Sequence, residues 1–193
     1  MEPGQERWRT SVARTLTRQA DESEDADGRR RFARAAIEEL DIALTLTEID
    51  RVALGIRIDI TKAAVLADDW ARARETAERV LVDNETCERS WQYGNAIHAA
   101  NVALGFAALA DDDLPLASEY LVRAGKTPGS PQLNSFGPDR DLARALLERG
   151  ERDALLAYLT ECARFWKGNE ALLEKWRTAI ERGEPTELER SYA

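Results

Sequence analysis

The residues best suited to chemistry lie in one predicted helix. His98 is the only histidine of the chain, with Trp91 and Asn95 seven and three residues before it and Gly105 seven residues after it. These spacings place the four residues on one face of a helix predicted over 87–110. An imidazole can act as an acid–base group near neutral pH, and a neighbouring amide can orient a substrate. The face is a candidate pocket floor; alternatively, Trp91 packs between repeats and the polar side chains bond loop carbonyls.

The second candidate element is the segment 125–138, which follows a predicted helix. Connections between helices usually take about 2–8 residues, and longer ones are often functional. Its three prolines stiffen the backbone, and its three glycines allow sharp turns or close approach. Either this loop binds a ligand or its amides satisfy its own backbone. This segment adds four candidate binding residues to Trp91, Asn95 and His98. They are Gln132, Asn134, Ser135 and Phe136.

These residues are embedded in a sequence whose apolar positions recur with a helical period nearly throughout. Between the first two predicted helices, the acidic stretch 21–28 is expected to be a solvated linker. About nine helices are predicted, over 5–19, 30–46, 48–67, 70–83, 87–110, 114–124, 139–149, 151–167 and 170–182.

An internal repeat runs through the middle of the chain. Residues 69–81 align with 113–125 at an offset of 44, and a weaker third copy follows about 38 residues later. Each copy begins after a tight turn, and the first two have alanine four positions on, which lets helices approach closely. Such stacked hairpins are typical of helical-repeat proteins. The identical pairs are Asp69/Asp113, Ala73/Ala117, Glu75/Glu119 and Arg79/Arg123.

Two segments also carry a resemblance to a known family. Residues 91–98 and the Gly-Ser-Pro-Gln-Leu-Asn-Ser-Phe-Gly-Pro run of the long loop resemble a family of uncharacterised bacterial tetratricopeptide-like proteins. The likeness covers about residues 48–182, and the chain departs from it at Gln92 and Asp139, where the family tends to have Asn. With the repeat, it implies an all-α, tetratricopeptide-like (TPR-like), right-handed superhelix of about nine helices with degenerate repeats. We predict one domain over 1–193: an N-terminal helix and linker (1–28), helical repeats (29–183) and a tail (184–193).

Composition and charge limit the kinds of partner, location and cofactor that we expect for this protein. The 193 residues carry a net charge of −9, which argues against nucleic acid, because phosphate neutralisation supplies most of that affinity. No apolar run reaches the roughly 18–20 residues needed to span a bilayer. Two isolated cysteines, Cys87 and Cys162, suggest a reducing, cytoplasmic location. With a single histidine they supply no zinc ligand set, and we predict neither metal nor cofactor.

Two functions follow from these features. The first is a protein-binding or scaffold module that holds a protein or peptide on its concave face, with no nucleic acid or membrane partner. The second is a small enzyme or small-molecule binder, whose pocket lies between the 87–110 helix and the 126–138 loop and uses His98 as acid–base group. A purely structural loop is a third interpretation.

Aromatic residues near the C-terminus, Phe165, Trp166 and Trp176, are expected in the core, although exposure of some of them would suggest a homodimer.

Overall fold

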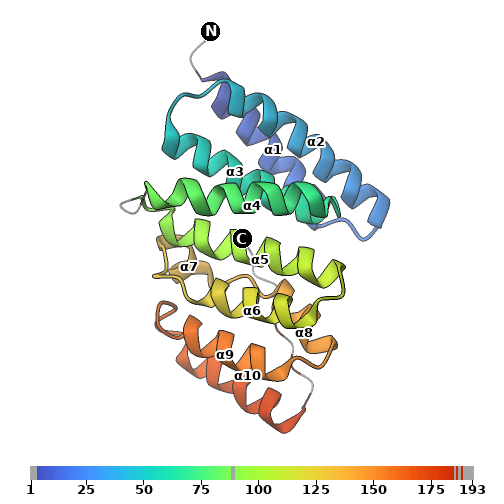
Figure 1. The fold of residues 1–193 in the computed structure, drawn as a ribbon, viewed down its shortest axis with the longest axis vertical. Coiled ribbons are helices and arrows are strands. Elements are labelled where there is room, and N and C mark those ends of the chain that lie inside the picture. The colour runs from blue at the N-terminus through green and yellow to red at the C-terminus, as the bar shows by residue number, and fades with distance from the viewer. Residues whose placement is uncertain (1–3, 88–89, 185, 187, 189–193) are drawn as a thin grey trace. The chain divides into compact units, whose positions relative to one another are not determined.

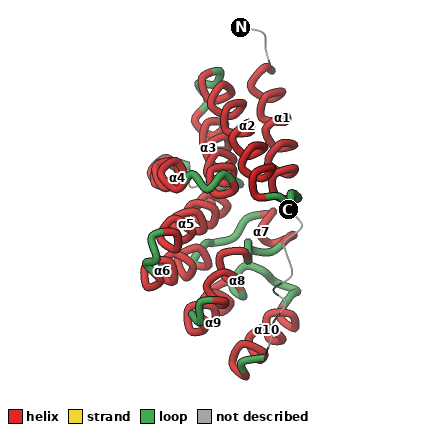
Figure 2. Tube along the Cα trace, turned by 90° about the vertical axis from the view of Figure 1, so that its right-hand side faces the viewer, coloured by secondary structure: helices red, strands yellow, loops and turns green. Residues whose placement is uncertain are grey.

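A computed structural model describes residues 4–87, 90–184, 186 and 188 of the chain. These residues form helices joined by turns and loops, without a strand, which confirms the all-α prediction for this part (Figure 2). None of their helices is long and apolar enough to cross a membrane. The helices are α1 (Gln5–Asp21), α2 (Ala26–Thr45), α3 (Asp50–Leu66), α4 (Trp70–Glu85), α5 (Tyr93–Ala110), α6 (Leu114–Gly125), α7 (Pro131–Phe136), α8 (Asp141–Glu148), α9 (Arg152–Cys162) and α10 (Glu170–Arg182) (Figure 1).

The chain divides into two compact units, residues 1–90 and 91–193. In the first unit, α1 to α4 pack as successive antiparallel neighbours (Figure 1). Small side chains such as Ala13 and Ala36 are fully buried where α1 meets α2, so the two backbones lie close together. The single domain over 1–193 stays a prediction.

The acidic connection between α1 and α2 is shorter than the predicted linker over 21–28. Asp25 caps α2: its carboxylate accepts hydrogen bonds from the main-chain N–H groups of Asp27 at 3.2 Å and Gly28 at 2.8 Å. These bonds satisfy donors that the first helical turn leaves free, so the helix starts at Ala26 and Gly28 is buried.

In the second unit, α5 and α6 form a hairpin, and α6 also packs against α9. The helix α8 contacts α5, α6 and α9, and α10 packs on α9. Phe165, Trp166 and Trp176 are only 6%, 5% and 3% exposed, which confirms that they belong to the core. Leu188, in the predicted tail over 184–193, is also buried in this core. Residues 185, 187 and 189–193 of that tail lie outside the described residues.

Three turns that precede the repeated helices share one geometry. Each places a residue in the left-handed region, with φ of 56° at Asp68, 61° at Asp112 and 89° at Gly150. The next main-chain N–H then reaches back to a carbonyl of the preceding helix, which caps that helix. The three bonds join Asp69 to Ala64, Asp113 to Ala108 and Glu151 to Leu146, each at 3.0 Å.

Three further predicted elements differ from the structure, among them the helix expected over 151–167, which ends at Cys162. The helix expected over 87–110 begins only at Tyr93, because the chain turns after α4: the main-chain N–H groups of Thr86 and Cys87 bond the carbonyls of Asp83 and Asn84. Residues 88–89 lie outside the described part. The segment 125–138, expected as a loop, contains the short helix α7, which raises the count to ten helices among the described residues.

Candidate functional site

His98 lies in the first half of α5 and is only 4% exposed. The main-chain N–H of Asp139 donates to its Nε2 at 3.0 Å, so this nitrogen carries no proton. A neutral ring then holds its proton on Nδ1, which donates to the main-chain carbonyl of Ala124 at 3.0 Å. In this arrangement main-chain groups occupy both ring nitrogens. The acid–base role of His98 stays a prediction that these contacts do not support.

Asp139 links His98 to two further helices. Its main-chain carbonyl accepts a hydrogen bond from the hydroxyl of Tyr158 in α9. Its side-chain carboxylate accepts one from the main-chain N–H of Asp141 at 2.8 Å, at the start of α8. The ring of Tyr158 stacks on the imidazole, with centroids 6.4 Å apart. The histidine is therefore part of a junction between α5, α8 and α9.

Asn95, one turn before His98, holds the start of α7. Its Oδ1 accepts a hydrogen bond from the hydroxyl of Ser130 at 2.5 Å, and its Nδ2 donates to Oε1 of Gln132 at 3.1 Å. Ser130 also caps α7 by accepting from the main-chain N–H of Leu133 at 3.0 Å. Asn95 and Gln132 thus meet, as predicted, but they bind each other.

The loop before α7 lies directly against α5. The hydroxyl of Thr127 donates to the main-chain carbonyl of Gly94 at 2.9 Å, and a Cβ on Gly94 would clash with the carbonyl of Gly129. On its other side, a Cβ on Gly129 would lie 2.6 Å from that of Phe165. With its amide nitrogen facing the carbonyls, Asn134 donates to Phe165 at 3.2 Å. The loop is packed between α5 and the chain that follows α9.

The remaining predicted residues are exposed. Trp91 precedes α5, so it does not share the helical face of Asn95 and His98, and 57% of its surface is exposed. Phe136, at the end of α7, is 59% exposed, and Ser135 beside it is also exposed. The predicted set therefore separates into a buried polar network and exposed residues at the surface of the second unit.

The site residues predicted from the sequence leave out several residues of this network. Thr127, Ser130 and Asp139 each bond α5, and Tyr158 covers the imidazole. One signal was local: Ser130 followed by a proline is typical of a helix start. The partners of Asp139 and Tyr158 lie far away in sequence, and no local pattern indicates them.

Burial also sets the protonation of two groups beside the network. Removal from water raises the pKa of the Tyr158 hydroxyl well above its ordinary value. The same cause raises the pKa of the Cys162 thiol to about 12. Both cysteines are free, and Cys162 is buried. Its high pKa keeps it a thiol at neutral pH, which is unsuited to nucleophilic attack.

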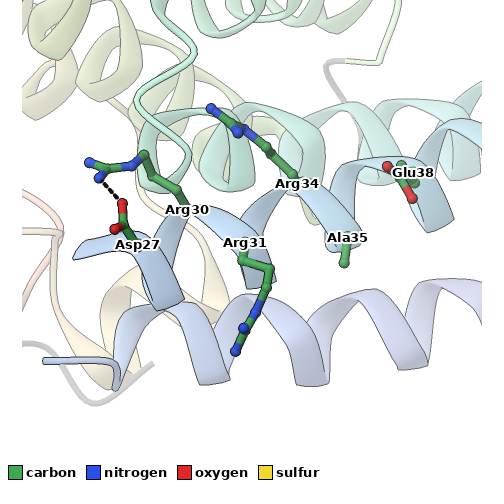
Figure 3. Close-up of a pocket in the computed structure, with 6 residues that line it drawn as sticks. All are labelled: Asp27, Arg30, Arg31, Arg34, Ala35 and Glu38. Carbon is green, nitrogen blue, oxygen red and sulfur yellow. Dashed lines mark hydrogen bonds and ion pairs between the residues drawn. The ribbon is translucent and has the colours of Figure 1, made fainter. Parts of the chain in front are cut away.

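A hollow of about 340 Å³ lies on the outer side of α2 in the first unit. We call it the α2 hollow; Figure 3 shows its lining side chains spread along the helix. Sequence reasoning passed over it, although the consecutive arginines at 29–31 are visible as a signal. Among the described residues, no group of three or more His, Cys, Asp or Glu side chains could hold a metal ion. The α2 hollow is lined by Asp27, Arg30, Arg31, Arg34, Ala35 and Glu38.

Comparisons of the chain with models of protein families, with curated proteins and with solved structures find no match.

Proposed function

We propose that this chain is a TPR-like helical-repeat module of the bacterial cytoplasm that binds a protein or peptide, either as a recognition domain or as a scaffold. The repeated architecture is supported by the three turns at Asp68, Asp112 and Gly150, which share φ > 0 and the same capping bond. Helices stacked in this way leave extended surfaces on which proteins commonly bind. The two free cysteines are in keeping with a reducing compartment.

The observation that carries the binding proposal is the exposure of two large aromatic side chains in the second unit. Trp91 and Phe136 are each more than half exposed, and aromatic residues dominate the energy of protein interfaces. The residue after Phe136 is Gly137, on which a Cβ would lie 2.6 Å from the ring of Trp166. A surface held in place by such packing loses little entropy on binding, which favours affinity.

The contacts of the polar network favour this function over a pocket enzyme. Asn95 and Gln132 bind each other, and both nitrogens of His98 bond main-chain groups. Their hydrogen-bonding capacity serves to hold the loop on α5. Binding energy would then come from the exposed residues, with Ser135 and the side-chain oxygen of Asn134 contributing polar contacts.

The experiment starts from peptides selected from a random displayed library against the wild-type protein. Their affinity is then measured by fluorescence anisotropy for wild type, W91A, F136A and the control W8A. Trp8 is 62% exposed and belongs to the first unit, so its loss matches the others in size and exposure. W91A or F136A should weaken binding by about tenfold or more, as expected for an interface anchor. Equal affinity in all four proteins, or a loss only in W8A, would refute the proposal that Trp91 and Phe136 bind the peptide.

A further inference from the structure

The first half of α2 concentrates positive charge in an acidic protein. Four arginines occur between positions 29 and 34, whereas the whole chain has a net charge of −9. Three of them, Arg30, Arg31 and Arg34, line the α2 hollow together with the carboxylates of Asp27 and Glu38, so the arginines outnumber the acidic side chains there. A local positive region of this kind attracts anionic groups even when the molecule as a whole repels them.

Two of the four arginines are engaged within the fold. Arg29 donates to the carboxylate of Asp68 at 3.0 Å, and Arg30 donates to the same carboxylate at 3.2 Å. Arg30 also bonds Asp27 at 2.5 Å. Because Asp68 belongs to the turn between α3 and α4, these bonds tie the start of α2 to that turn and hold Arg30 at one end of the hollow.

The other two arginines have no carboxylate partner in the described part of the chain. Asp27 lies four residues before Arg31 and would be its natural helical partner, but it pairs with Arg30. Glu38 lies four residues after Arg34, yet no ion pair joins them among the described residues. Arg31 and Arg34 are both exposed. The guanidinium of Arg31 lies over the ring of Phe32, 5.2 Å from its centroid. Both guanidinium groups can accept a carboxylate ligand without breaking an existing ion pair.

The arrangement of these side chains selects an elongated ligand. In Figure 3, Arg31 and Arg34 point to opposite sides of α2, and Ala35 lies on the helix beside them. Because the two side chains diverge, a ligand with two separated anionic groups can pair with both of them. A chain that crosses the helix at the short side chain of Ala35 can present one carboxylate to each arginine, in the bidentate geometry that guanidinium favours.

We infer that the α2 hollow is a docking site for an acidic peptide segment, held by Arg31 and Arg34 with Arg30 fixed beside them. This site lies in the first unit and is independent of the loop residues of the proposed function. Nucleic acid and anionic membranes are disfavoured, because their long arrays of negative charge would meet the net negative charge of the rest of the protein.

The test uses a fluorescein-labelled octapeptide of alternating Glu and Ser, titrated at low ionic strength and followed by anisotropy. The proteins are wild type, R31Q/R34Q and the matched control R18Q/R51Q. Arg18 and Arg51 are exposed in the same unit, and the control changes the net charge equally. We expect R31Q/R34Q to weaken binding about tenfold, the control to bind nearly as wild type, and added salt to weaken binding. W91A and F136A should bind the octapeptide as tightly as wild type does.

Three results with the peptide itself would overturn the inference: the absence of binding to wild type, an equal loss in both double variants, and equal binding of a Gln–Ser octapeptide. Displacement of the labelled peptide by inorganic phosphate far more readily than by glutamate at the same ionic strength would also overturn it, in favour of a phosphoryl ligand. The wild-type protein could also bind phosphatidylserine vesicles more tightly than the peptide. If R31Q/R34Q abolished that binding, the hollow would be assigned to a membrane instead.

Discussion

The main-chain N–H of Asp139 donates a hydrogen bond of 3.0 Å to Nε2 of His98, across 41 residues of sequence. On the other side of the ring, Nδ1 bonds Ala124 near the end of α6, where helical carbonyls lack partners within the helix. One buried imidazole therefore satisfies two main-chain groups from different elements. Its removal leaves both without a partner in the core of the second unit.

The H98A variant should lower the free energy of unfolding by about 2–4 kcal/mol, since it leaves a cavity and two unsatisfied buried groups. H98Q should lose less, because its Oε1 can still accept from Asp139. Urea unfolding followed by circular dichroism measures both. W91A serves as an exposed control that changes stability by less than about 0.5 kcal/mol. Wild-type stability in H98A would contradict the structural role.

Gly129 and Gly150 form a matched pair for testing how closely the loop packs. Both have positive φ, at 84° and 89°, but an added Cβ meets Phe165 at 2.6 Å only in the first case. G150A should cost about 1 kcal/mol of backbone strain. G129A should cost about 2–4 kcal/mol, because overpacking adds to that strain. Equal midpoints in urea unfolding would mean that the loop moves freely away from Phe165.

Cys162 should make the stability depend on pH in the alkaline range. Its pKa is about 12 in the folded protein, against an ordinary value of 9.0. Between these values the folded chain keeps the thiol proton and the unfolded chain releases it, so stability falls as pH rises. One such proton contributes a slope of about 1.4 kcal/mol per pH unit.

The C162A variant should lose this part of the slope when unfolding is measured from pH 8 to pH 11. L155A, which also removes a fully buried side chain from the same helix, should be less stable at every pH yet keep the wild-type slope. Parallel curves for wild type and C162A would show that the thiol is not shielded from water.

The repeated turns predict different costs for their capping residues. The carboxylates of Asp69 and Asp113 each accept from a main-chain N–H of the next helix at 3.1 Å, whereas Glu151 makes no such bond. D69A and D113A should each cost about 1 kcal/mol, and E151A clearly less. Thermal melts of the three variants at equal ionic strength measure this. A larger loss in E151A would mean that its bond to Ser118 matters more than the caps.

Local features were readable from the sequence because helices depend on interactions within a few residues. The helical period placed most elements within a few residues of their observed limits. The repeated Asp69 and Asp113 mark real helix starts, and Phe165, Trp166 and Trp176 are buried as expected. The missed helix α7 was also local, since Ser130 caps it and Pro131 fits its first turn. That error came from treating a proline- and glycine-rich segment as a loop.

The candidate site depended on contacts that only the folded chain creates. Sequence alone identified Asn95, His98 and Gln132 as unusual polar residues, but whether they face a ligand or one another depends on where residues 124–139 return to α5. Tertiary contacts also decide the state of the arginines of α2. Arg30 is paired because the fold brings Asp68 to it, whereas Arg34 is available because Asp68 does not reach it. Residue types and helical spacing act over a few residues, whereas hydrogen-bond satisfaction and exposure are decided by partners dozens of residues away.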